Sequence, residues 1–225
     1  MARPGDLDGF WRFWTGLLAL ILAPFVRLRV VGEEHVPATG AALLAGNHVS
    51  SLDGIVLAVV TARRAGRRTR FLIAAEYFGN PFLRWILTRS GQIPIRRGAR
   101  DLRALGAAES ALRSGVLAGI YPEGGVNEFP DRGMRPLRSG ASRLVAATGV
   151  PVLPVGVWGT QRRWPWAGPT FLRPWRPVVA LAYGAPVSPV DGGGDVVTLQ
   201  TISERIASAI REQLDRARTL AGADR

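Results

Sequence analysis

The chain of 225 residues contains no cysteine, no lysine and only two histidines. The absence of cysteine excludes disulfides, thiolate nucleophiles and Cys-ligated metals. Two histidines without a neighbouring ligand cluster argue against a structural zinc site, so we expect no metal and no bound cofactor. Every basic residue is arginine, and asparagine occurs only three times. We interpret this as coding bias and not as a choice of arginine at individual sites.

Acidic residues are also scarce, and they are unevenly distributed. The formal net charge is +12, and no Asp or Glu occurs from residue 132 to residue 190. That stretch holds eight arginines and four tryptophans: Trp158, Trp164, Trp166 and Trp175. A positive field favours an anionic partner, such as nucleic acid, phospholipid headgroups or a phosphorylated substrate. Arg and Trp together suit the headgroup region of a membrane, and they can also stack on single-stranded nucleic acid.

The N-terminal segment decides between these partners. It is aromatic at its leading end, and residues 13–26 carry no charge. As a helix this segment would be about 21 Å long, short of the roughly 30 Å hydrocarbon core of a bilayer. The aromatic cluster and the lack of a small-residue cleavage site argue against a signal peptide. We predict an interfacial or half-inserted helix, in preference to a buried one. Membrane phospholipids are then the expected partner, and nucleic acid is not.

The rest of the chain alternates between short apolar runs and helical patterns. Strands are predicted at residues 27–32, 41–46, 71–75, 92–95, 116–121, 150–158 and 178–183. Helices are predicted at residues 51–63, 81–88, 101–114 and 139–148, and a final amphipathic helix has the apolar stripe Leu199, Ile202, Ile206, Ile210 and Leu214. This alternation indicates an α/β fold with a mixed, largely parallel central sheet flanked by helices. In such a sheet, ligands bind at the carboxyl ends of the strands.

One of these strand ends carries a histidine and a carboxylate. His48 follows the apolar run 41–45, and Asp53 comes five residues later. Two positions that are five residues apart on one helix point about 140° away from each other. We therefore place His48 before the next helix and Asp53 in its first turn, with Ser50 or Ser51 as N-cap. The carboxylate can then reach back to the imidazole, as in a general base oriented by an acid. For such a pair alone, a structural histidine is the commoner explanation.

Three further motifs favour a functional His48 over a structural one. In chain order the four motifs are Asn47-His48-x4-Asp53, Gly91-Gln92-Ile93-Pro94-Ile95-Arg96-Arg97, Tyr121-Pro122-Glu123-Gly124 and Val150-Pro151-Val152-Leu153-Pro154-Val155. Together they resemble the four-block signature of the glycerolipid acyltransferases, the PlsC-type lysophosphatidic acid acyltransferases. The resemblance covers roughly residues 28–185. It implies an acyltransferase domain at residues 27–225, preceded by a membrane-associated helix at residues 1–26.

The resemblance also implies roles for the matching residues. His48 would deprotonate the acceptor hydroxyl, and Asp53 would hold the imidazole tautomer. The alkoxide would attack an acyl thioester directly, with acyl-CoA or acyl-carrier protein as co-substrate. Lysophosphatidic acid would become phosphatidic acid, a step of phospholipid biosynthesis. The expected location is the cytoplasmic face of the cell membrane, with peripheral or monotopic attachment. The residues expected to bind the acceptor are Arg97, Glu123, Gly124 and Arg138, and Pro154 matches the acyl-donor side.

One position departs from the family pattern. Block three usually reads Glu-Gly-Thr-Arg-Ser, whereas Val126 stands here at the position of the arginine. Arg132, Arg135 or Arg138 are candidates to compensate for it. Another lysophospholipid or lipid alcohol therefore stays open as the acceptor. A non-catalytic module that binds anionic membranes is the alternative from a different class. No Gly-x-Ser-x-Gly elbow supports a serine hydrolase.

Overall fold

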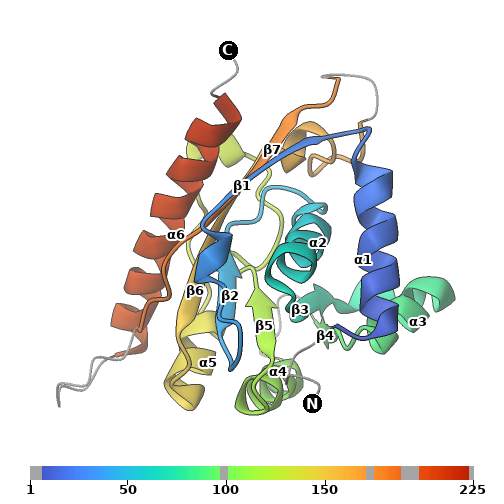
Figure 1. Cartoon of the computed structure of the whole chain (residues 1–225). Helices are drawn as coiled ribbons and strands as arrows, with labels where there is room; N and C mark the ends of the chain where they lie inside the picture. Colours follow the sequence, from blue (N-terminus) through green and yellow to red (C-terminus); the bar gives the residue numbers. More distant parts are fainter. Residues whose placement is uncertain (1–6, 97–100, 171–174, 189–197, 223–225) are drawn as a thin grey trace.

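The computed structural model describes residues 7–96, 101–170, 175–188 and 198–222. Within them, the centre is a seven-stranded sheet with the order β1-β7-β6-β2-β5-β3-β4 (Figure 1). The strands are β1 (Arg27–Val31), β2 (Leu43–Gly46), β3 (Thr69–Ala74), β4 (Ile93–Ile95), β5 (Leu117–Ile120), β6 (Val152–Trp158) and β7 (Val178–Tyr183). Each lies where the sequence predicts a strand.

The sheet is mixed and largely parallel, as predicted. Strands β6, β2, β5, β3 and β4 run in the same direction. β7 is antiparallel to β6, and β1 is parallel to β7, so these two strands run the other way. β2, which precedes His48, lies between β5 and β6 in the middle of the sheet. A site at its carboxyl end is therefore surrounded by the ends of two parallel neighbours.

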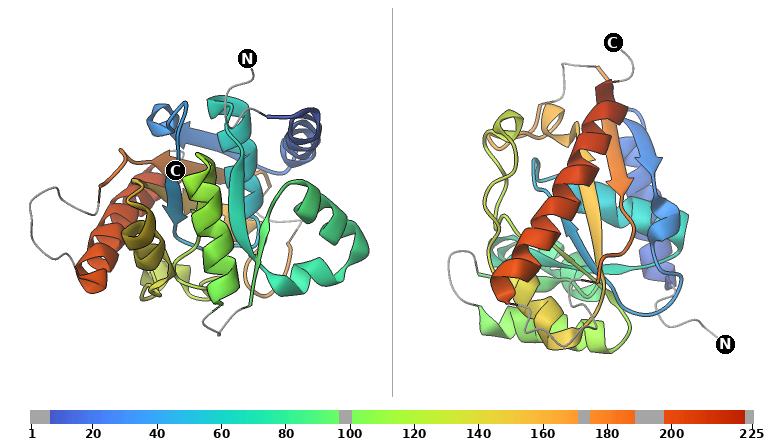
Figure 2. Two further views of the ribbon diagram at one scale, coloured as in Figure 1. Left: turned by 90° about the horizontal axis from the view of Figure 1, so that it is seen from below. Right: turned by 90° about the vertical axis from the view of Figure 1, so that its left-hand side faces the viewer.

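Helices cover both faces of the sheet (Figure 2). Leu44 packs under α2 (Asp53–Ala65), whereas Leu43 and Ala45 point to the opposite face, as the alternation of side chains along a strand requires. That opposite face is covered by α4 (Leu102–Arg113), α5 (Gly140–Thr148) and α6 (Leu199–Gly222). Because both faces are buried there, β2, β5, β6 and β7 are short continuous apolar runs.

The C-terminal helix α6 lies across β6 and β7. Ile202, Ile206, Ile210 and Leu214 of its predicted stripe are buried, but Leu199 is 38% exposed. Leu199 is the first residue of the helix, at the end of the stripe. The helix lies so close to β6 at Gly156 that a Cβ there would collide with the backbone of Gln213.

The N-terminal helix α1 (Gly9–Leu22) lies against α2 on the outside of the domain. Asp8 caps it by accepting the N–H of Trp11 at 2.9 Å. It ends before Pro24, earlier than predicted, because proline cannot continue a helix. Trp11 and Thr15 are buried, while Phe13 and Leu20 are 62% and 72% exposed. None of the helices in the described ranges is long and apolar enough to cross a bilayer.

Candidate active site

His48 follows β2 directly, in a turn held by the neighbouring strand β6. Asn47 donates from Nδ2 to the Val157 carbonyl at 2.9 Å and accepts the Val157 N–H at 2.8 Å. Asn47 is fully buried, so both hydrogen bonds are shielded from water and fix the chain just before His48. The prediction that a strand brings the histidine to the carboxyl edge of the sheet is confirmed.

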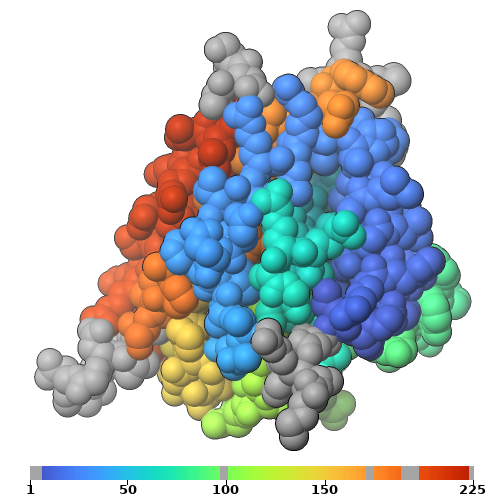
Figure 3. All heavy atoms as spheres, viewed as in Figure 1, coloured from blue at the N-terminus to red at the C-terminus, as the bar shows by residue number. Residues whose placement is uncertain are grey.

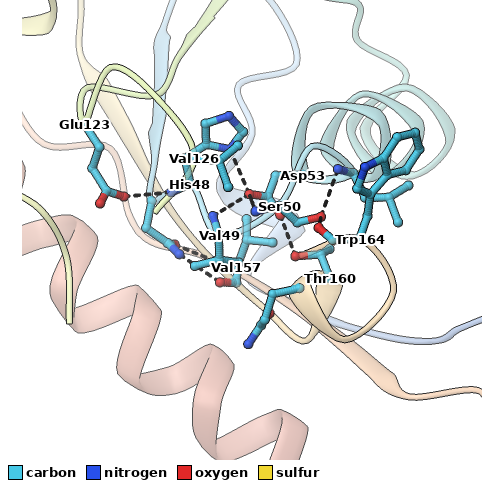
Figure 4. A network of polar contacts seen from close by, with 12 residues as sticks. His48, Val49, Ser50, Asp53, Glu123, Val126, Val157, Thr160 and Trp164 are labelled. Carbon is cyan, nitrogen blue, oxygen red and sulfur yellow. Dashed lines mark hydrogen bonds and ion pairs between the residues drawn. The ribbon is translucent and has the colours of Figure 1, made fainter. Parts of the chain in front are cut away.

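Asp53 is the first residue of α2 and reaches back to His48, as the spacing predicts (Figure 4). Its Oδ2 lies 2.9 Å from His48 Nδ1. The same oxygen accepts the N–H groups of Val49 and Ser50 at 2.7 and 2.8 Å. An ionised carboxylate can only accept hydrogen bonds, so the imidazole proton belongs on Nδ1 and the lone pair on Nε2. Nε2 makes no hydrogen bond to any residue that the structure describes.

The predicted N-cap of this helix is wrong. α2 begins at Asp53, and its N-cap Leu52 makes no side-chain capping bond. Ser50 Oγ instead accepts the Leu52 N–H at 3.0 Å and donates to the Trp164 carbonyl at 2.7 Å. Ser51 does not cap the helix either. Because the Asp53 carboxylate closes the turn on the Val49 and Ser50 N–H groups, the helix starts at the aspartate itself.

A third side chain contacts Asp53 from a distant part of the chain. The short 3₁₀ helix η4 (Thr160–Arg162) follows β6, and Thr160 Oγ1 donates to Asp53 Oδ1 at 2.5 Å. Thr160 is fully buried. Our sequence reasoning missed this contact, because 107 residues separate the two partners. The one signal in the sequence was that Thr160 comes just after the predicted strand 150–158.

Tyr121, just beyond β5, stacks on the imidazole. The ring centroids of His48 and Tyr121 are 4.1 Å apart, and the ring planes differ by 13°. The Tyr121 hydroxyl is buried and has no hydrogen-bond partner among the described residues. Burial, with a smaller contribution from the charge of Asp53, raises the pKa of Tyr121 well above 10. The phenol therefore stays protonated at neutral pH, and its ring supports one face of the imidazole.

Glu123 connects the histidine turn to the loop that follows β5. Its Oε1 accepts the backbone N–H of His48 and its Oε2 the backbone N–H of Arg135, both at 2.8 Å. The His48 carbonyl in turn accepts the Asn127 N–H at 2.7 Å. Glu123 is 2% exposed, and this burial raises its pKa, although the two N–H donors lower it. The geometry gives Glu123 a positioning contact with His48. Its predicted part in acceptor binding stays a prediction.

Two of the predicted cationic positions lie close to this loop. Gly124 has φ of 75°, and a Cβ there would collide with the side chain of Arg138. Glycine therefore lets the arginine lie across the loop. Arg135 Nη1 donates to the backbone carbonyl of Val126 at 3.3 Å, so a guanidinium lies beside the residue that replaces the family arginine. Arg97 lies outside the described residues.

The tryptophans between residues 132 and 190, the stretch without Asp or Glu, differ in their exposure. Trp158 belongs to β6 and is buried, with Arg218 stacked over it at 4.5 Å. This agrees with its predicted place at the end of the strand 150–158. Trp166 and Trp175 are 62% and 70% exposed. Arg132 stacks over Phe129 at 4.7 Å and not over the histidine turn.

Chemically, the site offers one oriented base beside a group of cations. His48 can take a proton at Nε2, and Asp53 can stabilise the imidazolium that results. No carboxylate pairs with the guanidinium of Arg135 or Arg138 within the parts of the chain that the structure describes. Nor do any three His, Cys, Asp or Glu side chains in those parts lie together as ligands for a metal ion.

Comparison with known proteins gives a consistent result. The family model described as Acyltransferase matches residues 27–158. A 1-acyl-sn-glycerol-3-phosphate acyltransferase of Borreliella burgdorferi is 28% identical over 142 residues, which are 60% of this chain and 53% of that protein. The chloroplastic enzyme BAT2 of Brassica napus, of the same name, is 27% identical over 160 residues, 69% of this chain and 44% of its own.

A solved structure shares the fold. It is the 1-acyl-sn-glycerophosphate acyltransferase PlsC from Thermotoga maritima, with a TM-score of 0.70 and 23% sequence identity. The match covers 90% of this chain and 78% of that one. By contrast, the chain spans only about half the length of the two sequence relatives.

Proposed function

Because the chain belongs to the glycerolipid acyltransferase family, we propose that it transfers a fatty acyl group from an acyl thioester to the free hydroxyl of lysophosphatidic acid. The product would be phosphatidic acid. The observation that carries the proposal is the contact between the partly exposed His48 and the buried Asp53, 2.9 Å apart, with Nε2 of the imidazole left available. The names of the relatives support the choice of acceptor.

The reaction needs one proton to move out and back. His48 Nε2 accepts the proton of the acceptor hydroxyl as its oxygen attacks the thioester carbonyl carbon. Asp53 stabilises the imidazolium at Nδ1. The C–S bond then breaks, and the imidazolium returns its proton to the leaving sulfur, so that a free thiol and an ester are formed. The thiol belongs to coenzyme A or to acyl-carrier protein, and both donors remain open in this proposal.

The acceptor phosphate is assigned to the arginines beside the histidine turn. A planar guanidinium binds a phosphate through two parallel hydrogen bonds. Arg135 and Arg138 lie in the segment tied to His48 through Glu123. Neither guanidinium forms an ion pair with a carboxylate of the described residues, although the charge of Arg135 acts on Glu123. Arg97 and Gly124 complete the proposed acceptor site. A second candidate function is acyl transfer to another lysophospholipid or lipid alcohol, which Val126 favours because it removes the usual arginine.

A panel of acceptors tests the choice. The purified protein is given an acyl thioester with lysophosphatidic acid, with a zwitterionic lysophospholipid or with monoacylglycerol, and thiol release and ester formation are measured. Arg135→Ala and Arg138→Ala should each lower kcat/KM for lysophosphatidic acid by about 10- to 100-fold, the value of a hydrogen bond to a charged group. Arg132→Ala, whose side chain stacks on Phe129, is the matched control. Faster turnover of monoacylglycerol than of lysophosphatidic acid would support the second candidate.

We further propose peripheral attachment to the cytoplasmic face of the cell membrane, through α1 and α3 (Pro81–Arg89). The two helices lie side by side on the surface (Figure 3). Their rings form one cluster: Phe10 lies 5.7 Å from Trp85, and Trp14 lies 6.3 Å from Phe82. Phe82 and Trp85 are 60% and 55% exposed. Exposed Trp and Phe beside arginine suit the interface between headgroups and acyl chains.

Flotation with anionic liposomes tests this attachment. The double variant Phe82→Ser, Trp85→Ser should bind at least about tenfold more weakly, because two rings no longer enter the interface. Leu102→Ser is the control, since Leu102 is 69% exposed on α4, on the other side of the sheet. Equal flotation of the double variant and the wild type would contradict the proposed surface.

A further inference from the structure

The two carboxylate oxygens of Asp53 have different partners. Oδ2 accepts three hydrogen bonds, all from its own turn: the His48 ring and the N–H groups of Val49 and Ser50. Oδ1 accepts its hydrogen bond from Thr160, at 2.5 Å. Both Asp53 and Thr160 are completely buried, so water does not compete for this contact. The orientation of the carboxylate therefore depends on a residue outside the turn.

We propose that Thr160 is a positioning residue of the proposed acyl transfer, the third member of a chain that runs Thr160–Asp53–His48. Its hydroxyl prevents the carboxyl group from rotating about χ2, which keeps Oδ2 opposite Nδ1. Partial rotation would lengthen the hydrogen bond between Oδ2 and Nδ1 and weaken the selection of the Nδ1–H tautomer. Nε2 acts as base only in that tautomer. This inference rests on the proposed function, whereas the contacts among Thr160, Asp53 and His48 are the same whatever the reaction is.

The position of Thr160 is itself determined by two anchored neighbours. Ser50 Oγ donates to the Trp164 carbonyl at 2.7 Å, which ties the end of the η4 segment back to the histidine turn. Arg163 Nε donates to the Phe25 carbonyl at 2.8 Å, just after α1. Figure 4 shows both Thr160 and the Trp164 carbonyl directed at the turn that contains Asp53. The segment that presents the hydroxyl is thus held by two contacts just after Thr160.

The chain also offers a matched control. Thr61 lies on the same helix as Asp53, two turns further on, and is 1% exposed. Its Oγ1 hydrogen-bonds the Tyr183 hydroxyl at 3.0 Å. Thr61→Val therefore removes an equally buried threonine hydroxyl from a neutral partner, away from the imidazole. Any general effect of losing such a hydroxyl will appear in this variant too.

The test compares Thr160→Val, Thr160→Ser and Thr61→Val in the full chain. Thr160→Val should lower kcat for acyl transfer by about 10- to 100-fold, the cost of a small misplacement of a reacting group, with KM within about threefold. Thr160→Ser keeps the donor and should stay within about threefold of the wild type, as should Thr61→Val. Wild-type kcat in Thr160→Val, or equal losses in the valine and serine variants, would overturn the proposal.

A second measurement needs no substrate. The chain has only two histidines, so two-bond ¹H–¹⁵N spectra resolve the tautomer of each imidazole. The wild type and Thr160→Ser should show His48 with its proton on Nδ1, and Thr160→Val should show a mixture. An unchanged tautomer in Thr160→Val would overturn the proposal. If Thr160→Val does not fold, Thr160→Ala removes the same hydroxyl and must show the same mixture. Failure of the wild type to transfer acyl groups would refute the proposed function, but the tautomer measurement would still test the role of Thr160.

Discussion

Replacement of Glu123 by alanine should both destabilise the domain and slow the proposed reaction. Glu123 accepts the N–H groups of His48 and Arg135, both at 2.8 Å, and is 2% exposed. A hydrogen bond to a charged group contributes about 1.5–3 kcal/mol, so the two together contribute about 3–6 kcal/mol. Burial of the carboxylate, which raises its pKa, offsets part of this. We expect a net loss of roughly 2–4 kcal/mol in the free energy of unfolding.

The loss can be measured by urea denaturation followed by tryptophan fluorescence, together with kcat for acyl transfer. Because Glu123 holds the backbone of His48, kcat should fall by about 10- to 100-fold. Glu109→Ala is the control: its exposed ion pair with Arg113 spans 2.8 Å on one helix and is worth about 0.5 kcal/mol or less. The reasoning is refuted if Glu123→Ala unfolds like Glu109→Ala and keeps the wild-type kcat.

The raised pKa of Glu123 adds a pH dependence with a definite sign. An acid whose pKa is raised on folding binds its proton more tightly in the native state than in the unfolded state. Its contribution to stability is therefore complete below its ordinary pKa of 4.5 and is lost as the pH rises through the raised value. The difference in unfolding free energy between the wild type and Glu123→Gln should fall across this window. If the difference in unfolding free energy instead grows with pH, the pKa of Glu123 is not raised on folding.

Two further substitutions test the packing around the site. Tyr121→Phe removes a buried hydroxyl without a described partner, so stability should be unchanged or rise by up to about 2 kcal/mol. Its kcat should stay within about threefold, and a collapse of kcat would show a chemical role that the stacking does not explain. Gly156→Ala places a methyl group against the backbone of Gln213 and should cost about 1–3 kcal/mol or more in thermal unfolding. An unchanged melting temperature would show that α6 can move away freely.

The elements of the fold were predictable because each has a local cause. Continuous apolar runs such as Leu117–Ile120 are strands buried on both faces, and the stripe Ile202, Ile206, Ile210 has the helical period. The order of the strands was not predictable in the same way. β1 and β2 are consecutive in the chain, yet β7 and β6 lie between them, and nothing in either strand encodes that separation.

The site shows the same division between local and distant causes. The contact between His48 and Asp53 follows from five residues of spacing and a helix start, so the sequence predicts it. Thr160 reaches Asp53 from 107 residues away, and only the neighbouring positions of β2 and β6 bring the two together. The capping prediction for Ser50 failed because the Asp53 carboxylate accepts the Val49 and Ser50 N–H groups, so that the helix starts at Asp53. The Ser50 hydroxyl donates instead to the Trp164 carbonyl, a partner that is equally remote in sequence.

The central claim is that His48 is the base of an acyl transfer, and the two histidines of the chain allow a direct test. His35 Nδ1 lies 3.1 Å from the carbonyl of Tyr183, at a position remote in the sheet from the carboxyl end of β2. Formation of phosphatidic acid from an acyl thioester and lysophosphatidic acid is measured for the wild type, His48→Ala and His35→Ala. We expect His48→Ala to lose product formation by at least about a thousandfold while remaining folded, and His35→Ala to keep it. Full activity in a folded His48→Ala protein would show that His48 is not the base.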